Sequence, residues 1–227
     1  AIRNAMRNGY TPAVARLHDW LECEKPYGAF MNEGECILLF LSEGSKELCD
    51  IESSGIDSIV TSFGGRPLGT KPVEIWLKHR NDAADEYEQY GAMGVLVDTI
   101  EISANWENIA KIYEETINRI YYEISETIYF SGHSSHSHLT GTNIYFQMGA
   151  LPEKSIEEAE RVYFNIWQIV METTLKYNGS ISHHHGVGKH KTRWMKEELG
   201  SSYVLMETLK NAFDPKGIMN PGVIIEK

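Results

Sequence analysis

The chain has 227 residues, of which 42% are hydrophobic and 23% are charged, and its formal net charge is −11. This composition is typical of a globular domain, and the negative charge argues against general binding to nucleic acid or to an anionic membrane, because both need a basic surface. No apolar run approaches the roughly 18 residues that a membrane-spanning helix requires.

The cysteine count indicates a reducing compartment. Three cysteines are too few, and too odd in number, for a disulfide framework, and none belongs to a CxxC pair. We therefore expect reduced thiols in a cytoplasmic protein. Residues 1–8 mix arginine and asparagine without an apolar core, so they do not resemble a signal peptide, and we expect the chain to open within a helix.

Hydrophobic patterning predicts the first half of the fold. Residues 35–41, bounded by glycines, indicate a buried strand. A helix is predicted over residues 46–63, and its apolar face is expected to hold Leu48, Ile51, Ile59 and Val60. Residues 96–102 predict a second strand, and Asn105 is expected to cap the next helix. The apolar residues of that helix recur at helical spacing: Ile109, Ile112, Tyr113, Ile117 and Ile120.

The second half begins with two predicted strands. Residues 127–130 and 143–148 are expected to pair on either side of a polar, histidine-bearing segment. The clearest helix covers residues 156–177, with Ser155 and Glu158 as a capping box. Its core face is expected to hold Ala159, Val162, Ile166, Ile169 and Val170.

Two shorter helices are predicted near the end of the chain, over residues 192–198 and 203–212. No linker or internal repeat interrupts this order of elements. The order predicts an α+β domain in which an antiparallel sheet is backed by helices on one side.

Three consecutive histidines are the most unusual local feature. His183, His184 and His185 lie in the glycine- and serine-rich segment 179–189, directly after the long predicted helix. Imidazoles titrate near physiological pH, so this row suits proton transfer or metal ligation, and the flanking glycines allow the backbone to approach a flat ring closely. A solvated polar loop is the alternative, but the position of the row favours function.

A second group of histidines lies in residues 132–138, between the two predicted strands. If strand alternation continues here, His136 and His138 share a face. Together with His184 they could then bind a divalent metal. The alternative is a solvated hairpin tip, and this segment alone favours neither interpretation.

Two single residues and the closing segment complete the set. Tyr145 lies on the last predicted strand, where a tyrosine taken alone would belong to the core. Arg16 stands among apolar residues on a short strand, and it needs an anionic or carbonyl partner if it is buried. The chain ends in a turn-rich segment, residues 213–222.

Taken in order, these segments resemble the C-terminal part of the alkyldihydroxyacetonephosphate synthases, which are vanillyl-alcohol-oxidase-type flavoproteins with an FAD-linked oxidase cap. The resemblance covers essentially the whole chain. It rests on Pro-Ala-x-x-Arg-Leu-x-Asp at 12–19, Asp-Thr-Ile-Glu at 98–101 before Trp106, Tyr-Phe at 145–146, Ser-x-Ser-His-His-His-Gly-Val-Gly-Lys at 180–189 and Asp-Pro-x-x-Ile-x-Asn-Pro-Gly at 214–222.

The resemblance implies catalytic roles for five residues. Tyr145 matches the tyrosine that acts as general acid and base on the substrate. His183, His184 and His185 match the histidines that lie against flavin and substrate, with His184 our choice for proton abstraction. Arg16 matches an arginine that holds the active site near the flavin.

The resemblance also implies contacts with substrate and cofactor. Lys189 and Arg193 could supply the charge that a phosphate headgroup needs. His185 and Asn220 are expected to contact FAD. One position departs from the family, because Tyr87 stands in an acidic stretch where the synthases have an arginine.

The implied architecture is a cap domain. Residues 1–227 would form a ferredoxin-like antiparallel sheet covered by helices, on the substrate side of an FAD-dependent enzyme. Its partner would be an N-terminal FAD-binding domain absent from this chain, because neither a GxGxxG helix opening nor another Gly-rich phosphate loop is present. We therefore expect the chain alone to bind no FAD tightly and to be inactive.

The implied reaction exchanges the acyl group of acyl-dihydroxyacetonephosphate for a fatty alcohol in ether-lipid synthesis. Its substrates are small lipid molecules, which leaves open peripheral contact with a membrane. A homodimer is also left open. Nothing in the sequence indicates binding to nucleic acid.

Two alternatives stay open. The first is an FAD-linked 2-hydroxyacid oxidoreductase of the D-lactate or glycolate type, whose members carry Gly-His-x-Gly-Asp-Gly-Asn-x-His and use its outer histidines with a glutamate as metal ligands. Residues 132–133 begin in the same way, which predicts a divalent metal site from His133, His138 and His184. The second is a non-catalytic binding module, supported by Tyr87 and its acidic neighbours.

Overall fold

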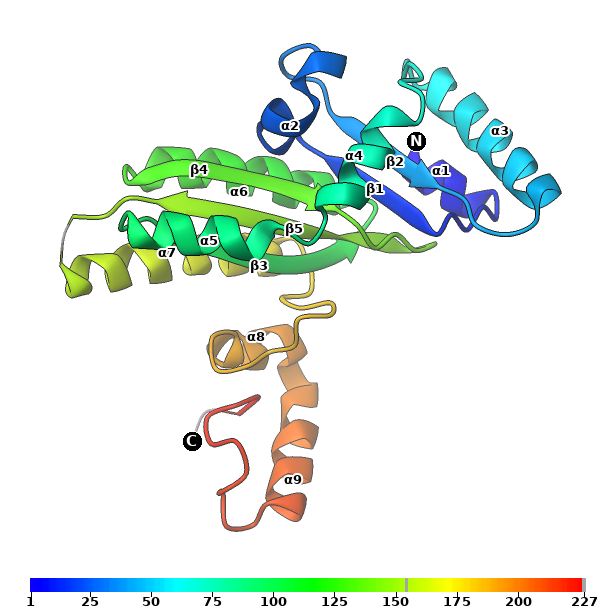
Figure 1. The fold of residues 1–227 in the computed structure, drawn as a ribbon. Coiled ribbons are helices and arrows are strands. Elements are labelled where there is room, and N and C mark those ends of the chain that lie inside the picture. Colours follow the sequence, from blue (N-terminus) through cyan, green and yellow to red (C-terminus); the bar gives the residue numbers. More distant parts are fainter. Residues whose placement is uncertain (154, 226–227) are drawn as a thin grey trace.

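A five-stranded antiparallel sheet forms the centre of the molecule (Figure 1). The structure is a computed structural model that describes residues 1–153 and 155–225, with the backbone alone described at residues 83–86. The sheet order is β2-β1-β4-β5-β3. Its strands are β1 (Val14–His18), β2 (Ile37–Leu41), β3 (Leu96–Asn105), β4 (Thr127–Ser134) and β5 (Gly141–Ala150). The predicted α+β class is confirmed, and each predicted strand is present.

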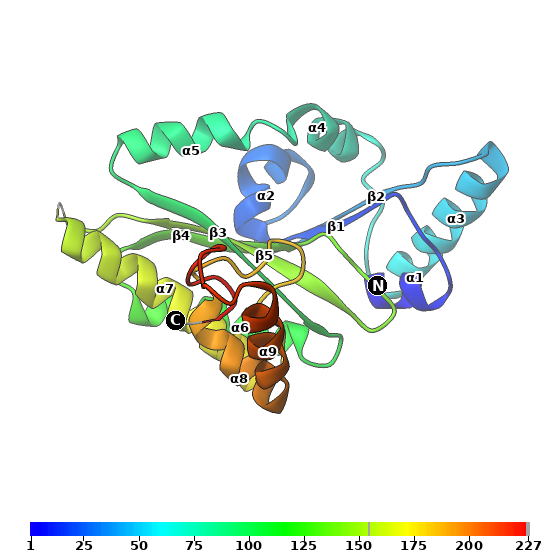
Figure 2. The same ribbon diagram turned by 90° about the horizontal axis from the view of Figure 1, so that it is seen from below.

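The main core lies between the sheet and two helices, α6 (Ile109–Glu123) and α7 (Ile156–Lys176), on one face (Figure 2). Side chains alternate along a strand, so every second residue points into this layer. Each fully buried apolar side chain there stabilises the fold by about 1.5–3 kcal/mol. The core includes Ile100, Ile102, Phe130, Ile144, Phe146 and Met148 from the strands, and Ile112, Ile120, Val162, Ile166 and Val170 from the helices.

Both long helices carry core positions that their spacing predicts, except that Ala159 in α7 is only half-buried and lies outside the core cluster. The start of α7 is also as predicted, because the Ser155 hydroxyl accepts a hydrogen bond from the Glu158 N–H at 3.1 Å. The predicted cap of α6 is wrong. The Asn105 side chain instead accepts hydrogen bonds from the N–H groups of Glu107 and Asn108, both at 3.1 Å, which makes a turn before the helix begins.

Three further helices cover part of the opposite face, namely α2 (Trp20–Tyr27), α4 (Lys71–His79) and α5 (Ala83–Ala92) (Figure 2). The expectation of helices on one side alone is therefore wrong, because β2 also turns apolar residues to this second face. A smaller core forms there from Cys23, Tyr27, Ile37 and Leu39. Helix α2 contains Pro26 and α5 is mostly polar, so hydrophobic spacing predicts neither. The side chains at 83–86, inside the acidic stretch, lie outside the described residues.

Helices α1 (Ile2–Arg7) and α3 (Lys46–Ser62) pack together beyond β2 (Figure 1). Helix α3 has the predicted length, but only half of its predicted apolar face is confirmed, because Ile59 and Val60 are half-buried. It buries Ile56, which is 3% exposed, whereas Leu48 and Ile51 are each 65% exposed. The reason is that α3 packs against α1 at the end of the sheet rather than across the sheet.

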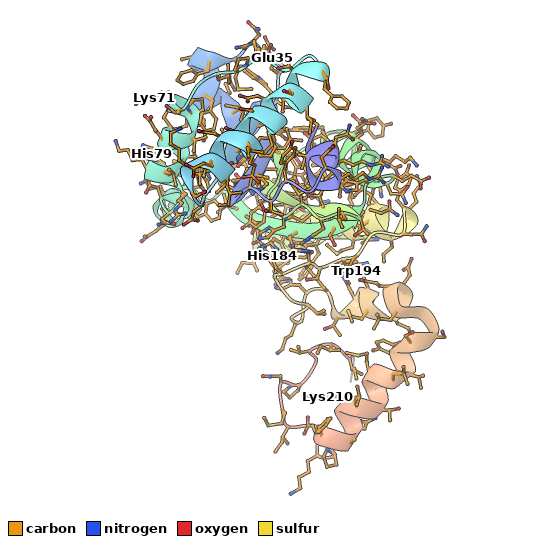
Figure 3. The ribbon with its side chains drawn as sticks, turned by 90° about the vertical axis from the view of Figure 1, so that its right-hand side faces the viewer. Glu35, Lys71, His79, His184, Trp194 and Lys210 are labelled. Carbon is orange, nitrogen blue, oxygen red and sulfur yellow. The ribbon has the colours of Figure 1, made fainter. Side chains whose placement is uncertain are left out.

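A C-terminal arm, residues 192–225, projects away from the sheet (Figures 1 and 3). It contains α8 (Met195–Leu199) and α9 (Tyr203–Phe213), which confirms the two short helices predicted here. Three single turns of 3-10 helix occur at Gly28–Phe30, Thr192–Trp194 and Gly200–Ser202. No helix in the described part of the chain is both long enough and apolar enough to cross a membrane.

Candidate functional site

The histidine loop, residues 178–191, is attached to the edge strand β3. Ser180 and Ser103 exchange both backbone hydrogen bonds, at 2.7 and 3.0 Å. Gly179 permits this approach, because a Cβ atom there would lie 2.8 Å from Cγ2 of Thr174 and 3.0 Å from the Ser103 carbonyl oxygen. From this anchor the loop reaches a side chain of β3 on the face of the sheet opposite to α6 and α7.

That side chain is Glu101, whose carboxylate is completely buried. It accepts backbone hydrogen bonds from His183, His184 and His185, at 3.0, 3.1 and 3.4 Å. Lys191 is also buried and donates to the Glu101 carbonyl oxygen at 3.0 Å. Burial alone would raise the pKa of Glu101, but the backbone hydrogen bonds and the neighbouring His184 hold that pKa below its ordinary value. The three N–H groups form an anion-binding nest, which fixes the backbone of the histidine row.

Four imidazoles gather next to this nest, and we call them the histidine cluster: His136, His138, His183 and His184. His184 Nδ1 lies 2.6 Å from the Glu101 carboxylate and 3.2 Å from His183 Nδ1. His138 Nε2 lies 3.3 Å from His183 Nε2, and the His136 ring centre lies 4.3 Å from that of His184. Figure 3 places His184 at the junction between the sheet and the C-terminal arm. Two segments far apart in the chain therefore contribute to one cluster.

A second group, the arginine cluster, consists of Arg16, His18, Glu22 and His133. Arg16 Nη2 lies 2.7 Å from His133 Nε2, and His133 Nδ1 lies 3.0 Å from one oxygen of Glu22. The other oxygen of Glu22 lies 2.9 Å from His18 Nδ1 and accepts a hydrogen bond from Gln147 at 3.1 Å. The strands β1, β4 and β5 and helix α2 thus meet through one carboxylate.

The protonation states in the arginine cluster follow from these contacts. Burial alone would raise the pKa of Glu22, but hydrogen bonds from His133 and His18 lower it well below its ordinary value. Burial lowers the pKa of His133, although Glu22 acts in the opposite direction. His133 is therefore a neutral ring at physiological pH, with its Nε2 lone pair directed to the Arg16 guanidinium.

Tyr145 lies between the arginine cluster and the histidine loop. Its ring stacks on His133 at 5.0 Å, with 19° between the ring planes, and meets the His185 ring edge-on at 5.0 Å. Tyr145 on β5 is the register partner of Glu101 on β3, which explains why the loop that Glu101 holds reaches the tyrosine. The structure therefore brings His185 of the predicted histidine row to Tyr145, and it places the tyrosine on His133, which contacts Arg16.

The predicted metal ligands are divided between the two clusters. His133 belongs to the arginine cluster, where Arg16 occupies its Nε2 atom, while His184 and His138 flank His183. Among the described residues, two groups have ligand atoms within 4.8 Å of one another, namely His136 with His183 and His184, and His18 with Glu22 and His133.

Three other predicted site residues lie in different surroundings. Lys189 is exposed on the histidine loop. The Arg193 guanidinium stacks on Trp194 at 4.0 Å and on Phe164 at 5.5 Å, within an aromatic group beside α7. Asn220 is exposed in the turn after α9, on the C-terminal arm. Of the residues expected to contact substrate phosphate or cofactor, His185 alone touches Tyr145 among the described residues.

The carboxylates that organise both clusters were not among the predicted site residues. Asp19 is the N-cap of α2, and it also accepts hydrogen bonds from the Gly132 N–H and the Tyr113 hydroxyl, both at 2.7 Å. The pattern of Asp19 followed three residues later by Glu22 is a helix-start signal that would have found the start of α2, although not the burial of Glu22. Glu101 had a weaker signal. It is the polar residue between Ile100 and Ile102 on one strand, so its side chain points to the opposite face of the sheet.

The family follows from comparison with known proteins. Residues 1–224 match the family described as FAD linked oxidases, C-terminal domain. The chain belongs to this family. Membership implies FAD as the cofactor of the whole enzyme and an FAD-binding domain as the partner of this one.

Individual relatives agree with that assignment. The chain is 37% identical to the uncharacterized FAD-linked oxidoreductase YgcU of Escherichia coli (strain K12), over all of the chain and 49% of that protein. It is 24% identical to the alkyldihydroxyacetonephosphate synthase of Dictyostelium discoideum, over 84% of the chain and 31% of that protein. A solved alkyldihydroxyacetonephosphate synthase structure has the same fold, with a TM-score of 0.69 and 17% identity over 97% of the chain and 41% of its own. The chain thus spans half or less of these relatives.

Proposed function

We propose that this chain is the substrate-side domain of an FAD-dependent enzyme of the alkyldihydroxyacetonephosphate synthase type. The observation that carries the proposal is the position of Tyr145 between the imidazoles of His133 and His185, with Arg16 beside His133. In the proposed reaction the ester carbon–oxygen bond to the fatty acid breaks and a bond to the fatty alcohol forms. The alcohol loses a proton and the fatty acid leaves, so there is no net redox change.

Proton transfer is assigned to Tyr145 and His185. Burial lowers the pKa of His185, so the ring is mostly neutral at physiological pH and can accept a proton. The Tyr145 hydroxyl can donate and accept a proton on the same face. This assignment replaces His184, our choice from the sequence, because His184 Nδ1 is held against Glu101 while the His185 ring touches Tyr145.

Arg16 is assigned to the anionic end of the substrate. Among the described residues its hydrogen-bond partners are two imidazole nitrogens, of His133 and His18, and no carboxylate. Its guanidinium also lies 5.3 Å from the centre of the Trp76 ring. Such a partly buried cation is stabilised by a bound phosphate or carboxylate, which a guanidinium binds through two parallel hydrogen bonds.

The same face fits a planar cofactor. Tyr145 and His133 present nearly parallel rings, and His185 lies against the tyrosine, so flat side chains are available to a flavin ring. When bound, FAD supplies the electrophilic ring for the covalent or redox step. The residues of this chain would orient the substrate, exclude water and move protons at the Tyr145 hydroxyl and the His185 ring.

The test uses the full-length protein loaded with FAD. Acyl-dihydroxyacetonephosphate and an isotope-labelled fatty alcohol are expected to give a labelled ether product and free fatty acid. Tyr145→Phe is expected to reduce kcat by about 10²–10⁴-fold, because it removes the exchangeable proton. Tyr122→Phe is the matched control, since that tyrosine is 90% exposed on α6, and it should leave kcat unchanged.

Two results would overturn the exchange reaction. Reduction of an electron acceptor with D-lactate or glycolate, without labelled ether, would establish a hydroxyacid oxidoreductase, because Arg16 can bind a carboxylate as well as a phosphate. Stoichiometric FAD without turnover of either substrate class would establish a non-catalytic binding module.

A further inference from the structure

We propose that His136, His183 and His184 form a binding site for a divalent cation of the Zn²⁺ class, with His138 as a fourth imidazole. This ligand set adds His183 to the first group that the sequence suggested, namely His136, His138 and His184. It leaves out His133, which belongs to the second suggested group. The proposal rests on the imidazole geometry and does not depend on the proposed reaction.

The ligand atoms of the three histidines have a spacing that suits a metal ion. One ring nitrogen from each of His136, His183 and His184 lies within 4.8 Å of the other two. Zn–N bonds of about 2.0–2.1 Å in a tetrahedral site place ligand nitrogens about 3.3 Å apart. The Nε2 atoms of His138 and His183 lie 3.3 Å apart, which already matches that separation. The other nitrogen–nitrogen distances in the group are at most 4.8 Å, and small rotations of these exposed rings would shorten them to the same value.

Oxygen atoms of neighbouring side chains hold the Nδ1 atoms of two of these rings. Glu101 lies 2.6 Å from His184 Nδ1, and the Ser135 hydroxyl lies 2.9 Å from His136 Nδ1. If each Nδ1–H donates to its oxygen, the two Nε2 atoms keep their lone pairs for a metal. A carboxylate behind a ligating histidine is the usual arrangement in metal sites, where it sets the tautomer and strengthens the ligand.

Hydrogen bonds hold both backbone segments that carry the rings. The nest of Glu101 fixes His183 and His184. The buried Asn143 side chain accepts hydrogen bonds from the N–H groups of Ser135 and His136, at 3.0 and 2.8 Å. Sites held on rigid backbones bind metal with less loss of conformational entropy.

The three ligand side chains are accessible from solvent. A hollow of about 330 Å³ next to the cluster is lined by His138 and His183 together with the β3 and β5 residues around Asn105 and Thr142. The three ligands are exposed, so a cation can enter and an open coordination position can hold water.

The arginine cluster is the weaker candidate, although its ligand atoms have similar spacing. The Glu22 carboxylate lies 3.0 Å from His133 Nδ1 and 2.9 Å from His18 Nδ1, so it already neutralises this group. The Arg16 guanidinium lies 2.7 Å from His133 Nε2, so its charge would repel a cation bound there. No such cation lies in contact with the rings of the histidine cluster among the described residues.

The experiment is a titration of full-length protein, freed of metal with a chelator, with Co²⁺ at pH 7.5. We expect one equivalent to bind with the visible absorption of a low-coordinate cobalt–imidazole site, and Zn²⁺ to displace it. His136→Asn and His183→Asn should each weaken binding at least about tenfold, and Ser135→Ala should weaken it about 10–100-fold if Ser135 orients His136. His79→Asn and His190→Asn are matched controls, because both histidines are exposed outside the cluster, and they should bind as the parent protein does.

Circular dichroism at 222 nm checks that each variant is folded. Unchanged Co²⁺ binding by both His136→Asn and His183→Asn would overturn the proposal. So would binding that survives in these two variants and disappears in His18→Asn, because the metal would then belong to the arginine cluster. The absence of binding by the parent protein at millimolar Co²⁺ would overturn it as well. None of these readouts depends on FAD or on turnover, so the fate of the proposed reaction is tested separately.

Discussion

The carboxylate of Glu101 lies 2.6 Å from Nδ1 of His184, although 83 residues separate the two along the chain. Glu101 is completely buried on β3, and it also receives the backbone N–H groups of the histidine row. One buried charge therefore determines both where the histidine loop runs and how its second ring is turned. The candidate site depends on this glutamate more than on any of the histidines.

Replacement of this carboxylate should destabilise the domain. Glu101→Gln keeps the shape of the side chain but loses the charge, and it turns an NH₂ group toward backbone donors. We expect the free energy of unfolding to fall by about 2–4 kcal/mol, because several charge-assisted hydrogen bonds weaken and some buried groups lose their partners. Urea denaturation followed by tryptophan fluorescence measures the change.

Glu107→Gln is the control for that experiment. Glu107 is exposed in the turn before α6, so its replacement should change the stability by less than about 0.5 kcal/mol. Equal stabilities of Glu101→Gln and Glu107→Gln would show that the nest does not hold the histidine loop.

The second buried carboxylate leads to a spectroscopic prediction. Glu22 raises the pKa of His133, in opposition to burial, so Glu22→Gln should lower the pKa of His133 further. The substitution also removes the acceptor shared by His18 and His133, and we expect a loss of about 1–3 kcal/mol of stability. NMR titration of the imidazole signals measures the pKa. Glu24→Gln, exposed on the same helix, should leave it unchanged, and a rise in the pKa of His133 would contradict the assignment.

Features that depend on interactions between residues close in the chain could be predicted from the sequence. Residues 156–177 show a helix in their own spacing, and Ser155 with Glu158 marks its start, so local rules suffice there. The row at 183–185 stands out by composition alone. Helix α3 shows what such local rules cannot predict. The spacing of its apolar residues indicates an apolar face, but it does not say which element covers that face, and Leu48 is exposed.

The buried charges could not be predicted in the same way. Glu22 contacts Gln147, 125 residues away, and His133, 111 residues away. Such contacts depend on sheet order and register, which bring β1 beside β4 and Tyr145 opposite Glu101. No local pattern encodes that order, so the sequence identified histidines of both clusters but not the carboxylates that position them.

Stability should fall with acidification below about pH 6.5. Burial lowers the pKa of His133 in the folded protein, whereas the unfolded chain has the ordinary histidine value of about 6.5. Between these two values the unfolded state binds more protons, so the free energy of unfolding rises with pH, and the stability present above pH 6.5 is lost below it. His133 contributes a slope of at most about 1.4 kcal/mol per pH unit.

Urea denaturation at pH 7.5, 6.5 and 5.5 measures this slope. His133→Gln should flatten it, while His79→Gln, an exposed position on α4, should retain the slope of the parent protein. Stability that rises as the pH falls from 6.5 to 5.5 would contradict the buried, neutral state of His133.

The anchor of the histidine loop gives a prediction with an internal control. A Cβ atom on Gly179 would lie 2.8 Å from Thr174 Cγ2, 2.9 Å from Ile112 Cδ1 and 3.0 Å from the Ser103 carbonyl oxygen, so Gly179→Ala must move the loop or the core. We expect a loss of about 1–3 kcal/mol. Gly91→Ala should instead stabilise the domain by about 0.5–1 kcal/mol. Gly91 lies in α5 and, apart from its chain neighbours and the backbone of α5 itself, no described atom lies within 4 Å of the added methyl group. Thermal denaturation of the two variants distinguishes a steric effect at the anchor from a general effect of replacing glycine. Stabilisation by both substitutions would show that the loop is not held at Ser103.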